Sequence, residues 1–388
     1  MTSRRHRLVH VTTTDMSLAL LLAPQLHAFE RAGYEVITMS APGPYTGDLH
    51  KQGLQHESIA HLTRRMAPQA DLRAFFELRR AFRRLQPDIV HTHNPKPGVF
   101  GRIAARSARV PGIVNTVHGL YALPQDRAAK RLTVYTLERV AARCSGAELV
   151  QNEEDIPVLA SLGITAPKVR LLGNGIDLTK FAAARVQAMR AEARAELGIA
   201  DNRVVVGVVG RLVVEKGYRE LFTAARELAA SDPNVTFLVV GPRDDDKHDA
   251  LSNTELEHVE KEANIALVGE RRDVDRMYAA MDVFALPSWR EGFSRSGMEA
   301  AACGLPVIAP DVRGCRQVVD HDVTGLLVPV RRPDALATAV RRVVRDHDLR
   351  VRMGAAGVAK AHREFDQQRV IDITLTAYDD VLRGQRHG

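Results

Sequence analysis

Short apolar runs alternate with longer amphipathic segments along the first half of the chain. The β-rich run 7–13 precedes the apolar segment 17–33, which ends at a glycine, and the strand-like run 34–42 follows it. The same succession recurs over 87–119. Runs of about four to eight apolar residues are typical of buried strands, whereas longer segments that end at glycine are typical of helices. The pattern therefore predicts repeated strand–helix–strand units.

This pattern begins again near residue 180 and continues to about residue 330. Two successive halves of this kind indicate an α/β protein with two doubly wound, Rossmann-like domains that face a central cleft. We expect the first domain over residues 1–178 and the second over 179–367. The amphipathic C-terminal segment, about 368–388, is predicted to cross back and join the first domain. A shared ligand site is expected at the carboxyl ends of the strands.

The composition is typical of a globular protein. Of the 388 residues, 45% are hydrophobic and 26% are charged. No apolar run approaches the ~18–20 residues that cross a bilayer, and the N-terminal residues lack the long apolar region of a signal peptide. Cys144, Cys303 and Cys315 lie far apart and form neither a disulfide framework nor a zinc motif. We therefore expect a cytoplasmic protein with reduced thiols.

Positive charge is concentrated in the first part of the chain. The net charge is +7, but residues 1–150 alone hold 21 Lys and Arg against 11 Asp and Glu. Seven of these arginines lie within 61–88, which predicts either the solvated face of a helix or a surface for an anionic partner. That partner could be membrane headgroups, a phosphorylated acceptor or nucleic acid, although an aromatic content of 5% argues against nucleic acid. The apolar side of this helix is predicted to carry Leu72, Phe75, Phe76, Phe82 and Leu85.

Two glutamates flank a predicted helix start in the second half. Glu291 lies in a glycine-containing turn after the strand-like run 282–288, and Glu299 lies in the alanine-rich segment that follows. Ser294 has the residue type of a helix N-cap, and amides after such a cap bind anions or hydroxyl groups. Carboxylates accept hydrogen bonds from vicinal hydroxyls, so this pair could hold a sugar and a ribose.

A second group of polar residues follows the first strand of the second half. Gly210 permits a tight turn, and Arg211 and Lys216 lie directly beyond the strand. Arginine clamps a diphosphate with a planar fork of donors, and lysine adds a compact charge. The spacing is not the G-x-G-x-x-G of nicotinamide-binding folds, which argues against an oxidoreductase. The two cations either bind a diphosphate or are surface charges of a loop.

The segments around these residues resemble a known enzyme family. Residues 291–299, EGFSRSGME, match the E-x7-E motif of retaining glycosyltransferases of the GT-B type. The segments GRLVVEKG, LPSWREGF, AAACGLPVIAPDVRGCRQVV and TGLLVPV resemble glycosyltransferase family four in the same order, and DIVHTHNPKPGVFGRIAAR, NTVHG and GNGID extend the likeness into the first half. The resemblance covers nearly the whole chain and is greatest to the capsular and lipid-linked oligosaccharide branch.

The resemblance implies a GT-B fold and a retaining transfer of a hexose or N-acetylhexosamine from a nucleotide-diphosphate sugar, with uridine as the favoured base. The implied acceptor is a hydroxyl of a glycan, of a polyprenyl-diphosphate-linked saccharide or of a small molecule. No metal or other cofactor is expected, and the leaving phosphate would accept the acceptor proton in a front-face attack. Peripheral membrane contact through the basic first domain would suit a lipid-linked acceptor. A sugar-nucleotide 2-epimerase of the same fold stays as the alternative function.

The resemblance also implies roles for individual residues. It places the diphosphate on Arg211 and Lys216, the ribose on Glu299, and the donor sugar near Glu291. His118, in NTVHG, falls where the family keeps a histidine beside the transferred sugar. The predicted catalytic residues are His118, Arg211, Lys216 and Glu291, and the predicted donor-binding residues are Gly210, Arg211, Lys216, Glu291, Gly292, Phe293, Ser294 and Glu299.

The sequence departs from the family pattern in two places. Ser294 stands where close relatives often have proline, and the loop TTTDMSL lacks the paired glycines of many members. Thr13, Thr14 and Ser17, in this loop, are expected to substitute for those glycines. The predicted acceptor-binding residues are Thr14, Ser17, His93 and Lys96.

Two motifs formally suggest a metal. Asp244-x-Asp246 resembles the aspartate pattern of metal-dependent transferases, and His91 with His93 resembles a zinc pair. The aspartates lie in a polar run that predicts a solvated loop. The histidines have no third ligand at a familiar spacing, and alternation along a strand places both on one face. We therefore predict no metal site.

Overall fold

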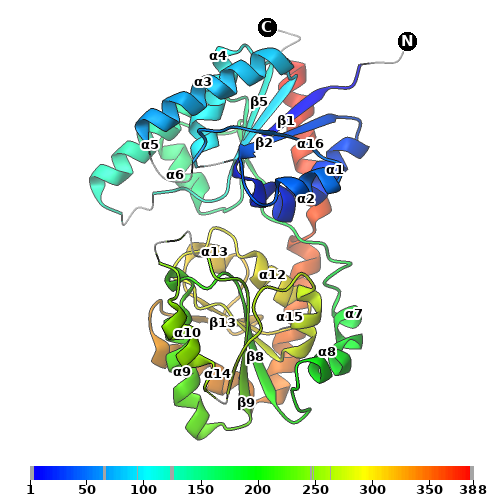
Figure 1. The fold of residues 1–388 in the computed structure, drawn as a ribbon, viewed down its shortest axis with the longest axis vertical. Helices are drawn as coiled ribbons and strands as arrows, with labels where there is room; N and C mark the ends of the chain where they lie inside the picture. The colour runs from blue at the N-terminus through cyan, green and yellow to red at the C-terminus, as the bar shows by residue number, and fades with distance from the viewer. Residues whose placement is uncertain are drawn as a thin grey trace. The chain divides into compact units, whose positions relative to one another are not determined.

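The chain forms two compact units, each a parallel sheet covered by helices (Figure 1). The computed structural model describes residues 4–63, 67–93, 95–122, 126–244, 247, 249–262 and 264–384. Unit 1 contains the chain up to residue 173 and from residue 368 onward, and unit 2 contains residues 174–367. The polypeptide therefore leaves unit 1, completes unit 2, and returns to unit 1 through its last helix.

Within the described residues of unit 1, seven parallel strands lie in the order β3-β2-β1-β4-β5-β6-β7. Because the order reverses between β1 and β4, the carboxyl ends of these two strands form a switch point, where ligands bind in sheets of this type. The strands are β1 (Arg7–Thr14), β2 (Glu35–Ala41), β3 (Gln55–Ser58), β4 (Ile89–His93), β5 (Gly112–Val117), β6 (Ala147–Val150) and β7 (Val169–Leu171).

The predicted helical segments 17–33 and 97–110 each begin with a π-helical turn and continue as an α-helix. The helices of unit 1 are η1 (Ser17–Leu22), α1 (Ala23–Arg31), α2 (Thr46–Lys51), α3 (Pro68–Leu85), η2 (Pro97–Gly101), α4 (Arg102–Ser107), α5 (Ala128–Ala142), α6 (Asp155–Ser161) and α16 (Gln367–Gly384).

Both faces of the unit 1 sheet are buried, and side chains alternate between them along each strand. Leu8 packs in the cluster that contains residues of α1 and α16, whereas Val9 packs in the cluster that contains residues of α3. His10 lies on the same side of β1 as Leu8 and therefore faces α16. This helix, drawn in red in Figure 1, places Tyr378 in the core of unit 1.

Helix α3 corrects one prediction. Its inward side consists of Asp71, Ala74, Leu78, Ala81 and Phe82. Leu72 and Phe76, predicted on the apolar side, are instead 58% and 55% exposed. At 3.6 residues per turn, both project roughly opposite the buried side. The helix thus presents two large apolar side chains outward.

The described part of unit 2 contains six parallel strands in the order β10-β9-β8-β11-β12-β13, with a switch point between β8 and β11. The strands are β8 (Val204–Val209), β9 (Val235–Val240), β10 (Ile265–Leu267), β11 (Val283–Ala285), β12 (Val307–Pro310) and β13 (Gly325–Val328). The helices are α7 (Ala183–Ala188), α8 (Arg190–Glu196), η3 (Val214–Lys216), α9 (Tyr218–Ser231), α10 (Asn253–Val259), α11 (Val274–Ala280), α12 (Arg295–Ala302), α13 (Arg313–Arg316), α14 (Pro333–Arg345) and α15 (His347–Glu364).

Candidate functional site

The loop between β8 and α9 is held tightly against the end of β11. Gly217 has a φ of +75°, and a Cβ atom there would lie 2.0 Å from the carbonyl oxygen of Pro287. The hydroxyl of Tyr218 donates to the carbonyl of Gly210 at 2.6 Å. Lys216 is the last residue of the 3-10 turn η3, directly before Gly217. A glycine is needed after Lys216 because only a backbone without Cβ fits this close approach.

Lys216 and Glu291 meet at the switch point of unit 2. Lys216 Nζ lies 2.6 Å from Glu291 Oε1, and the two side chains are 24% and 11% exposed. The predicted N-cap is confirmed, because Ser294 Oγ accepts a hydrogen bond from the Gly297 amide at 3.2 Å. Glu291 therefore lies in the turn that leads from β11 into α12. The arrangement joins a cation, a carboxylate and the start of a helix, where backbone amides carry partial positive charge.

Gly314 was not identified from the sequence, although it supports this turn. A Cβ atom at Gly314 would lie 2.4 Å from the carbonyl oxygen of Glu291 and 2.7 Å from that of Gly292. The backbone of α13 therefore contacts the turn directly. Nothing in the local spacing indicates this contact, because the two segments are adjacent only in the folded chain.

The carboxylate of Glu299 is held by two hydrogen-bond donors, one from α12 itself and one from α11. Its Oε1 accepts from Arg295 Nε at 2.9 Å, and its Oε2 accepts from the Tyr278 hydroxyl at 3.0 Å. Burial raises the pKa of Tyr278 well above its usual range, so this hydroxyl stays protonated and donates. Glu299 itself is 7% exposed. Its carboxylate is thus fixed in position before any ligand arrives.

The predicted solvated loop after β9 requires a correction at Asp244. This side chain forms an ion pair with Arg211 and is only 14% exposed. Asp246 lies outside the described residues, so the Asp-x-Asp motif is described only in part. Arg211, predicted to bind the diphosphate, is therefore paired with a carboxylate in the structure.

The predicted site residues of unit 1 follow β4 and β5. His118 comes directly after β5 and is half-buried, and its Nε2 lies 2.8 Å from His93 Nδ1. Burial lowers the pKa of His118, while a hydrogen bond with the Gln151 side chain raises it to a smaller extent. Lys96 is buried and forms an ion pair with Asp71.

Thr14 and Ser17, the other two predicted acceptor residues, lie at the carboxyl end of β1. Their hydroxyl oxygens are 3.1 Å apart. Between them, the buried Asp15 accepts hydrogen bonds from the amides of Met16 at 2.8 Å and Tyr45 at 2.7 Å. Asp15 was not singled out from the sequence, and it fixes the loop that carries both hydroxyls.

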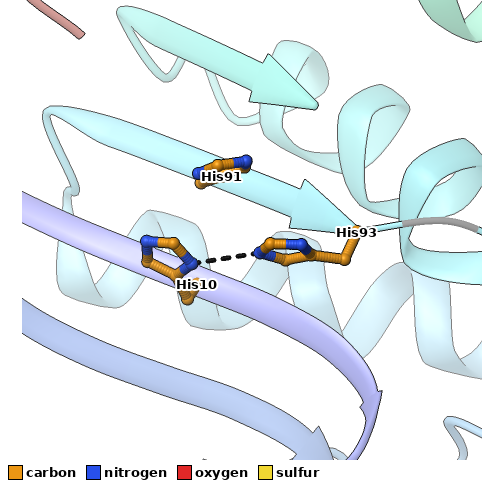
Figure 2. Close-up of side chains that lie close together, drawn as sticks. All are labelled: His10, His91 and His93. Atoms are coloured by element: carbon orange, nitrogen blue, oxygen red, sulfur yellow. Dashed lines mark hydrogen bonds between the residues drawn. The ribbon is translucent and has the colours of Figure 1, made fainter. Parts of the chain in front are cut away.

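The structure also supplies the third histidine that spacing did not reveal. His10 of β1 lies beside His91 and His93 of β4, and the three side chains are buried (Figure 2). His91 and His93 follow His10 by 81 and 83 positions in the sequence. They nevertheless lie close to it, because β1 and β4 are paired neighbours and His10 is directly opposite His91. Sequence spacing could not predict this because it depends on strand order.

Two family models match the two halves of the chain. The model described as "Glycosyltransferase Family 4" matches residues 22–180, and the model described as "Glycosyl transferases group 1" matches residues 189–360. A relative from Escherichia coli, the UDP-Gal:alpha-D-GlcNAc-diphosphoundecaprenol alpha-1,3-galactosyltransferase, is 31% identical, with 80% of this chain and 79% of that protein aligned. The capsular polysaccharide biosynthesis glycosyltransferase CapM of Staphylococcus aureus is 26% identical, with 98% of each chain aligned.

A solved structure of HepE from Anabaena in complex with UDP has a TM-score of 0.80 at 22% identity, covering 97% of this chain and 100% of that one. The sucrose-phosphate synthase of Thermosynechococcus elongatus has a TM-score of 0.79 at 21% identity, covering 98% of this chain and 100% of that one. These likenesses confirm the predicted GT-B fold. The chain is thus a glycosyltransferase of the nucleotide-sugar-binding GT-B kind. It belongs to glycosyltransferase family 4, and the epimerase alternative finds no support among these relatives.

Proposed function

We propose that the protein is a metal-independent, retaining glycosyltransferase that moves a hexose or N-acetylhexosamine from a UDP-sugar to a hydroxyl of a lipid-linked saccharide. The observation that carries this proposal is the Lys216–Glu291 ion pair, 2.6 Å long, in the turn before α12. A cation beside a helix start suits a departing diphosphate, and the carboxylate suits a sugar hydroxyl. Names of the relatives support the substrates, since the E. coli relative is named for UDP-Gal and a diphosphoundecaprenol-linked acceptor.

The charge that develops as the donor bond breaks determines the role of each of these residues. Breaking the bond between the anomeric carbon and the diphosphate leaves a departing anion, and fixed positive groups near that anion lower the barrier. Lys216, Arg211 and the amides after Ser294 supply such groups without a metal. No side chain of these motifs is placed as an obvious nucleophile, so the proposal includes front-face attack with the leaving phosphate as proton acceptor. Glu299 would accept hydrogen bonds from the ribose, and His118 would contact the transferred sugar.

A panel of uridine, guanosine and adenosine diphosphate sugars in EDTA tests the donor site. Because a ligand that binds only the folded state stabilises it, we expect a UDP-sugar at about a hundredfold excess over its Kd to raise Tm by about 5 °C or more. The Glu299→Ala variant is expected to lose most of this rise. Differential scanning fluorimetry measures both effects.

Glu257, exposed on α10 of the same unit, provides the matched control. The Glu257→Ala variant should show the parental shift. A shift that appeared only after a divalent cation was added would contradict the metal-independent donor site, and an equal shift in Glu299→Ala would contradict the ribose assignment.

We further propose that α3 contacts the headgroups of an anionic membrane. Five exposed residues of this helix project within roughly 100° of arc at 3.6 residues per turn. They are Leu72, Arg73, Phe76, Arg80 and Arg83. Arginines beside outward apolar side chains are typical of helices that lie at a membrane surface. We name these five residues the α3 surface. No described helix is both long and apolar enough to cross a membrane.

Vesicle flotation tests the α3 surface. Anionic lipid attracts each surface arginine by about 1 kcal/mol, so Arg73→Glu/Arg80→Glu/Arg83→Glu should lower partitioning onto vesicles with phosphatidylglycerol by roughly a hundredfold. The charge-matched control is Lys261→Glu/Arg352→Glu/Arg363→Glu, at exposed positions of unit 2. Equal losses in the two variants would indicate a nonspecific charge effect and contradict the assignment to α3.

A further inference from the structure

A group of polar side chains is buried between the sheet of unit 1 and α16. It consists of His10 from β1, His91 and His93 from β4, Thr116 from β5 and Tyr378 from α16, and each of them is at most 4% exposed. The proposed function assigns no step of the sugar transfer to any of these five side chains, although His93 is among the residues predicted to contact the acceptor. Figure 2 shows the three histidines from the two neighbouring strands.

The histidine rings do not fit a shared metal ion. A metal binds imidazole nitrogen along the lone pair, which lies in the plane of the ring. The rings of His91 and His93 are stacked, with centroids 4.5 Å apart and planes inclined by 17°. Two nearly parallel rings at this separation cannot both direct a lone pair at one ion. Moreover, the two nitrogens of His91 already lie near Tyr378 and Thr116.

Hydrogen-bond distances instead link the group into one continuous chain. Thr116 Oγ1 lies 2.7 Å from His91 Nε2, and His91 Nδ1 lies 2.6 Å from the Tyr378 hydroxyl. That hydroxyl lies 3.0 Å from His10 Nε2. His10 Nδ1 then lies 3.1 Å from His93 Nε2, the contact that is dashed in Figure 2.

The chain ends at the predicted catalytic histidine, because His93 Nδ1 lies 2.8 Å from His118 Nε2. Burial lowers the pKa of His10 to about 3 and also lowers the pKa values of His91, His93 and His118. All four imidazoles are therefore neutral near pH 7. A neutral imidazole carries one N–H donor and one acceptor nitrogen.

Because each neutral imidazole has one donor and one acceptor nitrogen, the tautomer of one histidine fixes the tautomer of the next histidine in the chain. If Tyr378 donates to His10 Nε2, then His10 donates from Nδ1 to His93, and His93 donates from Nδ1 to His118 Nε2. His118 must then carry its own proton on Nδ1. If Tyr378 donates to His91 instead, each of these protons moves to the other nitrogen, and His118 carries its proton on Nε2. Within this chain, the orientation of the Tyr378 hydroxyl thus decides which His118 nitrogen carries the proton. The Gln151 side chain also forms a hydrogen bond with His118, and an amide, which has both a donor and an acceptor, can pair with either tautomer.

We propose that Tyr378, His10 and His93 are positioning residues that hold His118 in one neutral tautomer. The consequence for turnover rests on the proposed function, in which the His118 ring contacts the transferred sugar. An imidazole in the wrong tautomer presents a donor where an acceptor is needed, or the reverse. The C-terminal helix therefore contributes to the site through a residue 260 positions from His118.

Tyr378→Phe is the direct test, because it removes the hydroxyl and keeps the ring. In protein labelled with 15N-histidine, long-range 1H–15N spectra distinguish protonated from bare ring nitrogens, and the His118 signals are those lost in His118→Ala. We expect one His118 tautomer in the parent and a mixture in Tyr378→Phe. We also expect kcat to fall by about 10- to 100-fold, with the donor KM unchanged, as for other partners that orient a functional histidine.

Tyr34→Phe is the matched control, since the Tyr34 ring packs against Tyr378 with centroids 5.7 Å apart and its hydroxyl is not part of the chain. It should leave the His118 signals and kcat unchanged. Thr116→Val removes the other end of the chain and serves as the second variant should Tyr378→Phe not fold. Unaltered His118 signals in a folded variant of either kind would overturn the proposal, as would one tightly retained zinc or nickel ion per chain that His10→Ala abolishes.

The two possible failures can be told apart. If His118→Ala transferred sugar as fast as the parent, the role of His118 in the proposed function would be wrong. The spectra would still decide whether Tyr378 sets the His118 tautomer, because they require neither donor nor acceptor.

Discussion

Replacing Lys216 with alanine is expected to lower kcat by about 10²- to 10³-fold at saturating donor, the loss typical of removing one fixed group that stabilises developing charge. The ammonium lies 2.6 Å from Glu291 Oε1, so its position is set before the donor binds. Without it, the departing diphosphate loses a cation and the Glu291 carboxylate loses its partner. Initial-rate measurements with a UDP-sugar and a lipid-linked acceptor give kcat, and titration calorimetry gives the donor Kd.

The control for Lys216→Ala is Lys247→Ala. Lys247 also pairs with a glutamate, Glu215, at 3.2 Å, and it has no predicted role in the site. Its removal changes the net charge equally and should leave kcat within about twofold. Lys216→Arg keeps the charge and should recover part of the rate, although the planar group cannot reproduce the compact ammonium. A Lys216→Ala enzyme with parental kcat would refute the assignment of the diphosphate to this loop.

Replacing Arg102 with methionine is expected to reduce the free energy of unfolding of unit 1 by about 3–5 kcal/mol, as for other broken buried ion pairs. Arg102 Nη1 lies 2.7 Å from Glu148 Oε1 and Nη2 lies 2.7 Å from Glu138 Oε1, and the arginine and Glu148 side chains are fully buried. Asn115 Nδ2 donates to the other oxygen of Glu148 at 2.8 Å. Removing the guanidinium leaves two carboxylates in the core without their cation, and this desolvation cost drives the loss.

Two optical signals separate the units in a urea titration. The single tryptophan, Trp289, belongs to unit 2, so its fluorescence reports that unit, whereas far-UV circular dichroism reports both. We expect Arg102→Met to shift only part of the circular dichroism change to lower urea. Arg106→Met, at an exposed position of the same helix, should shift neither signal. Adding Glu138→Gln and Glu148→Gln to Arg102→Met should restore much of the stability, and a failure to do so would point to lost packing as the cause.

The sequence was most informative where function depends on short segments. Ser294 was predicted as an N-cap from its residue type and its place before an alanine-rich run, and the structure confirms it. The alternation of apolar runs likewise follows from local backbone requirements. Such features need only neighbouring residues, so their physical causes are visible in the order of amino acids.

Predictions were weaker where a side chain's partner is distant in sequence. Leu72 and Phe76 were placed on the apolar side of their helix, but apolar character alone does not say which side a helix buries. Asp244 was assigned to a solvated loop, whereas it pairs with Arg211. Neither spacing nor composition encodes these contacts, since both depend on how strands and helices pack.

The sequence by itself determined two α/β halves, the cations after the first strand of the second half, and the helix start between Glu291 and Glu299. Only the tertiary structure decided that His10, His91, His93, His118 and Tyr378 form one hydrogen-bonded chain. The reason is physical: strand order in a parallel sheet places β1 beside β4, and the returning helix α16 adds a hydroxyl from the far end of the chain. Local propensity fixes which residues become strands, but long-range packing selects which of their side chains meet.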